Sequence, residues 1–195
     1  GSEMCIRDRN QIEYIDNLSL IASAFSSFAK MPGANPVEIN LLEQIKTTLE
    51  LFRNTDNVTF WVRWPHESKV FIYADKEQIN GIFSNLIKNS IQAIPQDRKG
   101  LIKVTLEVVR DKVLISVADN GTGIPETLQD KMFTPNFTTK SSGTGLGLSI
   151  VKKYVEAANG RIWFKSDAEN GTTFYVEFPL KYTVEKPGEL YEDKQ

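Results

Sequence analysis

Helix-like and strand-like segments follow one another in this chain in an order that a doubly wound parallel sheet does not allow. The predicted helices cover residues 39–53, 75–94 and 144–158, and the predicted strands cover residues 58–64, 69–73, 101–109, 113–118, 162–165 and 172–178. Because strands come in pairs instead of alternating strictly with helices, this order favours a two-layer α/β sandwich. We expect a mixed sheet of about five strands with three helices on one face, preceded by one amphipathic helix.

Turn and cap signals support these boundaries. Asp75 is a suitable N-cap for the second helix, and Pro95 ends that helix. The first hairpin is expected to turn at residues 110–112, and Asn170-Gly171 is a strong signal for the second hairpin turn. The strand at 113–118 therefore delivers Asp119 to the end of the sheet.

The chain of 195 residues is long enough for one domain of ordinary size with an appendage. Residues 1–9 are interpreted as a tag or an unassigned leader, and residues 182–195 as a flexible tail. Between residues 10 and 31, apolar side chains recur at spacings of four and three residues, as in a coiled-coil seam: Tyr14, Leu18, Ile21, Phe25 and Phe28. The stripe spans only about two heptads, so an amphipathic helix packed on its own domain is the alternative. Prolines at 32 and 36 separate this helix from a domain expected at 36–181.

Composition excludes several classes of function. The chain has 23 Lys and Arg against 25 Asp and Glu, so nothing in its charge predicts a nucleic-acid partner. With Cys5 and His66 as the only cysteine and histidine, it has neither an internal disulfide nor a zinc ligand set. No apolar run approaches the ~20 residues of a membrane span, so we expect a cytoplasmic fragment without membrane contact.

Asn85 and Asn89 lie four residues apart on a predicted helix, so they project from one face, one turn from each other. Their amide oxygens can converge on one ion. Mg²⁺ takes hard oxygen ligands, and it usually binds few protein groups while substrate phosphates complete its shell. The pair therefore predicts a Mg²⁺ and nucleotide site; two surface asparagines are the alternative.

Asp119 ends a predicted strand and is followed by a sharp turn with Gly121 and Gly123. A carboxylate in this position can accept a hydrogen bond from the adenine amino group, whereas guanine carries an oxygen there. The two glycines would let the backbone approach the base and ribose. An ordinary Asx turn after a strand is the alternative interpretation.

A glycine-rich segment is predicted to open the last helix, where free N–H groups favour phosphate. It contains Gly143, Thr144, Gly145, Leu146 and Gly147. It is not a P-loop, because no Lys-Ser/Thr follows at the required spacing. It is not a dinucleotide-binding fingerprint either, because residues 138–142 before it are polar and loop-like instead of strand-like. Before it, residues 133–142 are expected to form a lid with Phe133 and Phe137 as anchors, and with Thr138, Thr139 and Lys140 near the phosphates.

Taken in order, the segments 85–89, 119–123, 133–140 and 143–147 resemble the N box, first glycine box, F box and second glycine box of bacterial sensor histidine kinases. This family belongs to the wider ATPase group that includes gyrase, Hsp90 and MutL. The resemblance covers residues 37–180. The amino-acid sequences of residues 89–94 and 138–148 are similar to those of the nitrogen-regulation branch of the family. It implies ATP between the helix layer and a mobile lid, with Asn89 as the Mg²⁺ ligand. The family often has Lys or Arg where this chain has Gln92.

The resemblance implies a kinase domain that transfers the γ-phosphoryl of ATP to a histidine, with Asn89 and Lys140 as the catalytic residues. His66 lies in a predicted turn, so the acceptor histidine is expected outside this fragment, on a dimerisation and phosphotransfer helix of the same parent. The helix at 10–31 resembles the second helix of that hairpin. The resemblance also implies that a response regulator receives the phosphoryl group from that histidine. The parent protein is expected to be a homodimer and can be anchored in the inner membrane.

Two other functions share these motifs. A serine kinase that inhibits a sigma factor would carry a catalytic acid and no dimerisation hairpin. A module in which nucleotide only switches a protein interface would need no phosphotransfer.

Overall fold

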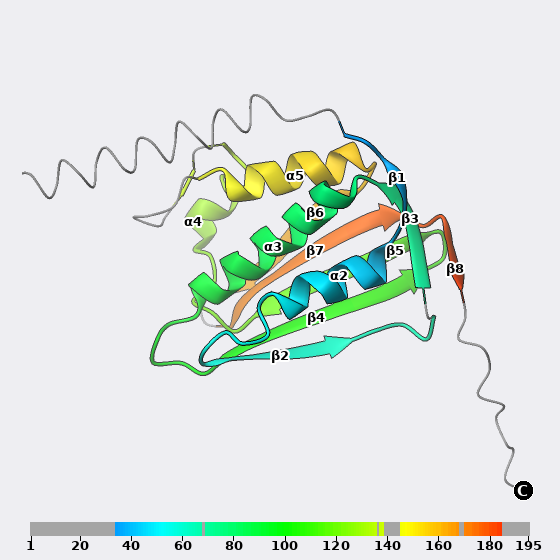
Figure 1. Ribbon diagram of the computed structural model, residues 1–195. Coiled ribbons are helices and arrows are strands. Elements are labelled where there is room, and N and C mark those ends of the chain that lie inside the picture. Colours follow the sequence, from blue (N-terminus) through cyan, green and yellow to red (C-terminus); the bar gives the residue numbers. More distant parts are fainter. Residues whose placement is uncertain (1–33, 68, 136, 139–144, 168–169, 185–195) are drawn as a thin grey trace, which may run out of the picture.

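The computed structural model describes residues 34–67, 69–135, 137, 138, 145–167 and 170–184. Figure 1 shows these residues in two layers, a twisted sheet with helices α2, α3 and α5 on one face. In chain order the elements are β1 (Val37–Asn40), α2 (Leu41–Glu50), β2 (Val58–Arg63), β3 (Lys69–Ala74), α3 (Lys76–Ala93), β4 (Gly100–Val109), β5 (Lys112–Asp119), α4 (Glu126–Gln129), α5 (Gly147–Ala157), β6 (Arg161–Asp167), β7 (Gly171–Pro179) and β8 (Tyr182–Val184).

The main sheet has five strands in the order β2-β4-β5-β7-β6. β2 runs parallel to β4, and the other neighbouring pairs are antiparallel. A second, three-stranded antiparallel sheet in the order β1-β3-β8 lies at the end of the domain where β5 begins (Figure 1). The predicted α/β sandwich with a mixed five-stranded sheet is confirmed.

The core lies between the helix layer and the covered face of the main sheet. Alternate residues of β4, β5 and β7 point into it, as the period of two requires. The helices contribute apolar residues at helical spacing, with Phe83 of α3 and Phe178 of β7 among the largest fully buried side chains. This packing holds α3 rigidly on the sheet, which matters because α3 carries the predicted asparagine pair.

Two predicted boundaries at the ends of the domain differ from the structure. Ile39 was expected to begin a helix, but it pairs with Ile72 in β1. β1 has four residues and α2 follows it directly, so β1 is too short to show a strand periodicity of its own. Ile39 therefore matched the helical spacing of the residues after it and was predicted as helix. Residues 182–195 were expected to form a flexible tail, but residues 182–184 form β8, which pairs with β3. That pairing depends on partners more than a hundred residues away in sequence.

The last helix begins later in the chain than predicted. α5 starts at Gly147, whereas the prediction began at Thr144, which lies outside the described residues. The short helix α4 had no counterpart among the predicted elements. The expected leader at 1–9, the helix at 10–31 and the tail beyond residue 184 also lie outside the described residues.

Asp75 is the N-cap of α3, as predicted. Its side chain accepts hydrogen bonds from the backbone N–H groups of Gln78 at 3.0 Å and Asn35 at 2.8 Å. The Asn35 bond is the largest influence on the pKa of the Asp75 carboxyl and lowers it, while burial opposes this and the Gln78 bond adds to the lowering. The cap therefore joins the start of α3 to the chain that precedes β1.

Replacing Asp75 with alanine should lower the free energy of unfolding by about 1 kcal/mol, because the first turn of α3 loses an acceptor. Since the pKa of Asp75 is lowered in the folded chain, this stabilisation is complete at neutral pH and is lost as the pH falls below about 4. In urea denaturation the difference between wild type and variant should therefore shrink in acid. Asp97→Ala, in the exposed loop after α3, is the control and should leave the midpoint unchanged. A difference that stays the same at all pH values would contradict the capping role.

Candidate functional site

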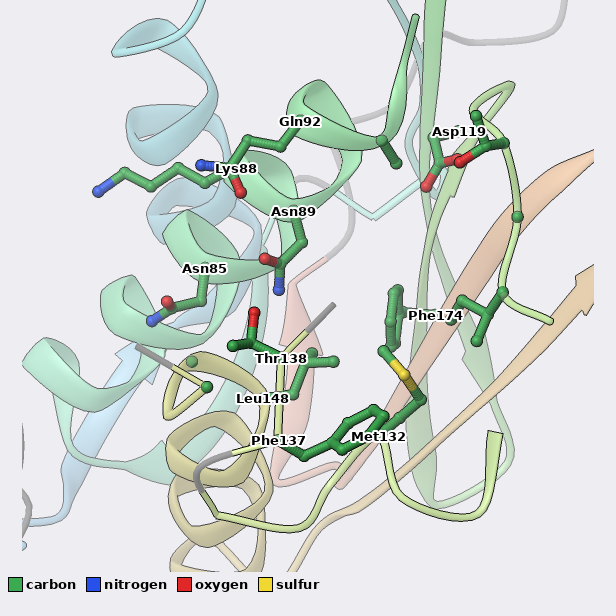
Figure 2. Close-up of a pocket in the computed structure, with 16 residues that line it drawn as sticks. Asn85, Lys88, Asn89, Gln92, Asp119, Met132, Phe137, Thr138, Leu148 and Phe174 are labelled. Atoms are coloured by element: carbon green, nitrogen blue, oxygen red, sulfur yellow. The ribbon is translucent and has the colours of Figure 1, made fainter. Parts of the chain in front are cut away.

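A pocket of about 470 Å³ opens where α3, the turn after β5 and the start of α5 meet (Figure 2). This volume is in the range of about 300–1,000 Å³ that small-molecule sites occupy. Its described lining residues are Asn85, Lys88, Asn89, Gln92, Ala93, Asp119, Thr122, Gly123, Ile124, Met132, Phe137, Thr138, Gly145, Gly147, Leu148 and Phe174. The pocket therefore gathers residues from all four predicted motif segments.

The asparagine pair lies on the pocket side of α3, one helical turn apart, as its spacing predicted. The Asn85 side-chain nitrogen donates to the Gly81 carbonyl at 2.9 Å. Its oxygen faces α5, because a Cβ built on Gly147 would lie 3.2 Å from it. The first turn of α5 thus approaches the pair closely, and Gly147 is the residue that permits this approach.

On the α3 side of the pocket, the described oxygen donors are the side-chain amides of Asn85, Asn89 and Gln92. Among the described residues, no group of three or more His, Cys, Asp and Glu side chains could hold a metal ion. Mg²⁺ fits a site with few protein ligands when phosphate oxygens complete its coordination. The donor set therefore fits Mg²⁺, and Asn89, the predicted ligand, would hold it.

Asp119 is buried, with 7% of its surface exposed, and lines the pocket away from the asparagine pair (Figure 2). One carboxylate oxygen accepts hydrogen bonds from the N–H groups of Gly121 at 2.9 Å and Thr172 at 3.2 Å. β7 can approach this closely because it begins with Gly171, which has a φ of +87°. A Cβ there would lie 2.0 Å from the Asp119 carbonyl oxygen.

The two glycines of the turn have different surroundings. Gly123 lines the pocket and has a φ of +71°, a conformation that favours glycine. Gly121 is not among the lining residues. A Cβ on it would lie 2.6 Å from the Ala93 carbonyl oxygen at the end of α3. Gly121 is therefore required by packing against the helix, which differs from the predicted approach to the base and ribose.

The lid and the second glycine segment are only partly described. Phe137, Thr138, Gly145 and Gly147 line the pocket, as expected. Besides Gly121, two described site residues predicted in these segments lie outside the lining. Phe133 packs against the ring of Phe164, with ring centroids 5.9 Å apart, and Leu146 is buried as the N-cap residue of α5. The remaining predicted site residues of these segments, Thr139, Lys140, Gly143 and Thr144, lie outside the described residues.

Sequence reasoning missed several lining residues. Phe174 forms an apolar wall, and its place on the inward-facing side of β7 follows from the period of two, but its position beside Asp119 does not. Lys88 was read only as part of the helix. Leu148 ends the glycine-rich segment but was assigned no role there, and Met132 belongs to no predicted motif, because an apolar residue near a motif looks like any core residue.

His66, which was predicted to lie in a turn, is exposed in the loop between β2 and β3 and does not line the pocket. Within the described ranges, no helix is both long and apolar enough to cross a membrane.

Comparison with known proteins places this geometry in a family. Residues 74–182 match the family model of the histidine kinase-, DNA gyrase B- and HSP90-like ATPases. Sporulation kinase A of Bacillus subtilis is 32% identical over 171 residues, which are 86% of this chain and 28% of that protein. Nitrogen regulation protein NtrY of Azorhizobium caulinodans is 31% identical over 176 residues, which are 87% of this chain and 22% of that protein. The chain thus spans less than a third of the length of these relatives.

Solved structures agree with this assignment. The catalytic domain of histidine kinase ThkA is 38% identical, with a TM-score of 0.67, and the match covers 74% of this chain and 95% of that domain. ThkA in complex with the response regulator protein TrrA is matched with a TM-score of 0.71 and 32% identity, over 86% of this chain and 48% of ThkA. The chain therefore belongs to the histidine kinase-, DNA gyrase B- and HSP90-like ATPase family, and its described part is the ATP-binding catalytic domain of a two-component sensor histidine kinase.

Proposed function

We propose that this domain binds Mg²⁺-ATP with adenine at Asp119 and phosphates at Asn85 and Asn89, and that its parent protein transfers the γ-phosphoryl to a histidine on a dimerisation helix. The observation that carries the proposal is the arrangement of one pocket with a buried carboxylate at one end and two amides at the other (Figure 2). Adenosine triphosphate has the matching order of groups, with an amino-bearing base at one end and phosphates at the other.

Adenine selectivity is assigned to Asp119. An ionised carboxylate only accepts hydrogen bonds, so it pairs with the adenine amino group and opposes the oxygen that guanine carries there. Its position is fixed by the N–H groups of Gly121 and Thr172, which occupy one carboxylate oxygen. Phe174, which lines the same pocket and is 4% exposed, excludes water from one wall of the base site.

The phosphate end is assigned to two helices. Asn85 and Asn89 come from α3, and α5 begins at Gly147 opposite them. The first-turn N–H groups of a helix have no partner within the helix, which suits them to phosphate. Mg²⁺ held by Asn89, with Asn85 beside it, would neutralise phosphate charge when bound. Lys140 and Thr139 of the lid are proposed to contact the same phosphates. The protein then acts by positioning and charge neutralisation.

The acceptor and the partners are inferred from the chain and its relatives. His66, the one histidine in this sequence, lies away from the pocket, so the reacting imidazole must come from another segment or subunit. We assign it to the dimerisation helix of a homodimeric parent, with residues 10–31 as the second helix of that hairpin. The complex of ThkA with TrrA supports a response regulator as the next acceptor. We place this domain in the cytoplasm, where ATP and response regulators are found.

A hydrogen-bonded clamp holds the turn that presents Asp119. On the solvent side, the Arg98 guanidinium donates to the carbonyl oxygens of Asn120 at 2.6 Å and Gly121 at 2.9 Å. The Asn120 side chain donates in turn to the Lys99 carbonyl at 2.9 Å. Because the turn is bonded on both sides, nucleotide binding would order little of it, which favours affinity.

Asp119→Asn should weaken ATP binding by on the order of 2 kcal/mol, because the amide can turn an N–H group toward the adenine amino group. The fold should survive, since an asparagine oxygen can still accept from Gly121 and Thr172. Calorimetry with ATP and GTP should show strong preference for ATP in the wild type and little preference in the variant. Asp111→Asn, in the turn at the other end of β5, is the matched control. Equal affinity of the wild type for ATP and GTP would remove the adenine-reading role.

Arg98→Ala should loosen the turn without unfolding the domain. Losing a charged donor that bonds two carbonyls should speed hydrogen exchange at the amides of Gly121 and Thr122 by about 10-fold. Lys99→Ala keeps the backbone carbonyl that Asn120 uses, so it serves as the control and should exchange like the wild type. If the two variants exchange alike, Arg98 does not hold the turn.

Phosphotransfer should require Asn89 and an acceptor supplied from outside. With radiolabelled ATP, the isolated chain should take up almost no acid-labile label. Addition of full-length parent that carries Asn89→Ala but keeps its acceptor histidine should give label on that parent. Asn89→Ala in this chain should abolish the transfer, whereas His66→Ala and the exposed control Asn54→Ala should not change it. Strong self-labelling that His66→Ala removes would refute the proposed external acceptor.

A further inference from the structure

We infer that Lys88 is a phosphate-contacting cation of this pocket, an inference that rests on the proposed function and extends it. Among the described lining residues only two carry a charge, Asp119 and Lys88. They lie at different ends: Figure 2 shows Asp119 on one side of the pocket, and Lys88 with Asn85 on the other. The pocket is therefore electrically polar along the direction in which a nucleotide would lie.

Lys88 lines the pocket from the edge of α3, and its side chain is exposed to solvent. Lys88 comes three residues after Asn85 and directly before Asn89, so it shares the edge of α3 that borders the asparagine pair. Figure 2 shows the Lys88 side chain extended outward on the same side as Asn85. Lysine holds a strongly hydrated point charge on a flexible stem, which suits contact with phosphates at a solvent-exposed opening.

The charge of Lys88 is available to an anion. In the described part of the chain it takes part in none of the five ion pairs, and no acidic side chain lines its end of the pocket. Lys152 on α5 differs, because its ammonium group lies 3.9 Å from Glu156 and over the ring of Phe133. Lys88 is thus the described cation best placed to meet a polyphosphate.

This assignment separates two parts of nucleotide affinity. Contacts at Asp119 act on the base, so adenosine and ATP share them. A contact from Lys88 acts on phosphates, so only ATP and ADP gain from it. Because the ammonium group is exposed to solvent, its contribution should also fall with rising ionic strength.

The test is calorimetry of the wild type, Lys88→Ala and Lys88→Arg with Mg²⁺-ATP, and with adenosine by competition. Lys88→Ala should bind ATP about 10-fold more weakly, the effect of losing one partly screened charge-assisted contact, and should bind adenosine like the wild type. Lys88→Arg should keep most of the ATP affinity. Lys76→Ala is the matched control, since Lys76 is an exposed lysine at the opposite end of the same helix. Adding Gln92→Lys to Lys88→Ala should restore ATP affinity, because position 92 lines the pocket one turn further along α3.

The outcomes separate this inference from the function on which it rests. A wild type that binds neither ATP nor adenosine refutes the proposed function. A wild type that binds ATP, with Lys88→Ala and Lys76→Ala indistinguishable from it, overturns the role of Lys88 alone. Parallel loss of ATP and adenosine affinity in Lys88→Ala also overturns it, because a general structural effect would not distinguish the two ligands.

Discussion

The buried carboxylate of Asp119 is the interaction on which the arrangement of the pocket depends. One of its oxygens accepts the N–H groups of Gly121, in the turn after β5, and of Thr172, near the start of β7. These bonds join the end of β5, the turn that follows it and the start of β7, which is the neighbour of β5 in the sheet. The connection is possible because β7 begins at Gly171, where any Cβ would meet the Asp119 carbonyl. A buried polar group is costly unless it is hydrogen-bonded, so the bonds that shape the turn also satisfy one oxygen of this buried side chain.

Helix α3 links this carboxylate to the other end of the pocket. Its inner face is fixed in the core by residues such as Phe83, while its pocket face carries Asn85 and Asn89. At its end, the Ala93 carbonyl accepts the Thr122 N–H at 3.0 Å, and Gly121 packs against the same residue. The spacing between Asp119 and the asparagine pair is therefore set by helix α3.

Local chemistry explains which parts of this arrangement could be predicted from the sequence. The Asp75 cap, the spacing of the asparagines and the strand that ends at Asp119 each depend on residues close in sequence, and each prediction agrees with the structure. β1 and β8 depend on pairing with β3, which no local pattern reveals. The same holds for Gly121, whose reason is contact with α3, and for Phe133, whose ring meets Phe164 on β6. Long-range contacts decided every one of these differences.

The two ends of the pocket also differ in exposure, and this difference bears on the chemistry. Asp119 and Phe174 are buried, whereas Lys88 is exposed at the mouth and Asn85 is half-buried. A base held in the dry end gains the most from a fixed carboxylate, because hydrogen bonds are stronger where water is excluded. At the end proposed for the phosphates, the described side chain of Lys88 is exposed. The proposed acceptor on another helix would need such access to the terminal phosphate. A closed pocket of the same composition could hold ATP and hydrolyse it, yet could not pass the phosphoryl group to a protein. The difference in exposure between the two ends therefore supports the proposed transfer to an acceptor outside this domain.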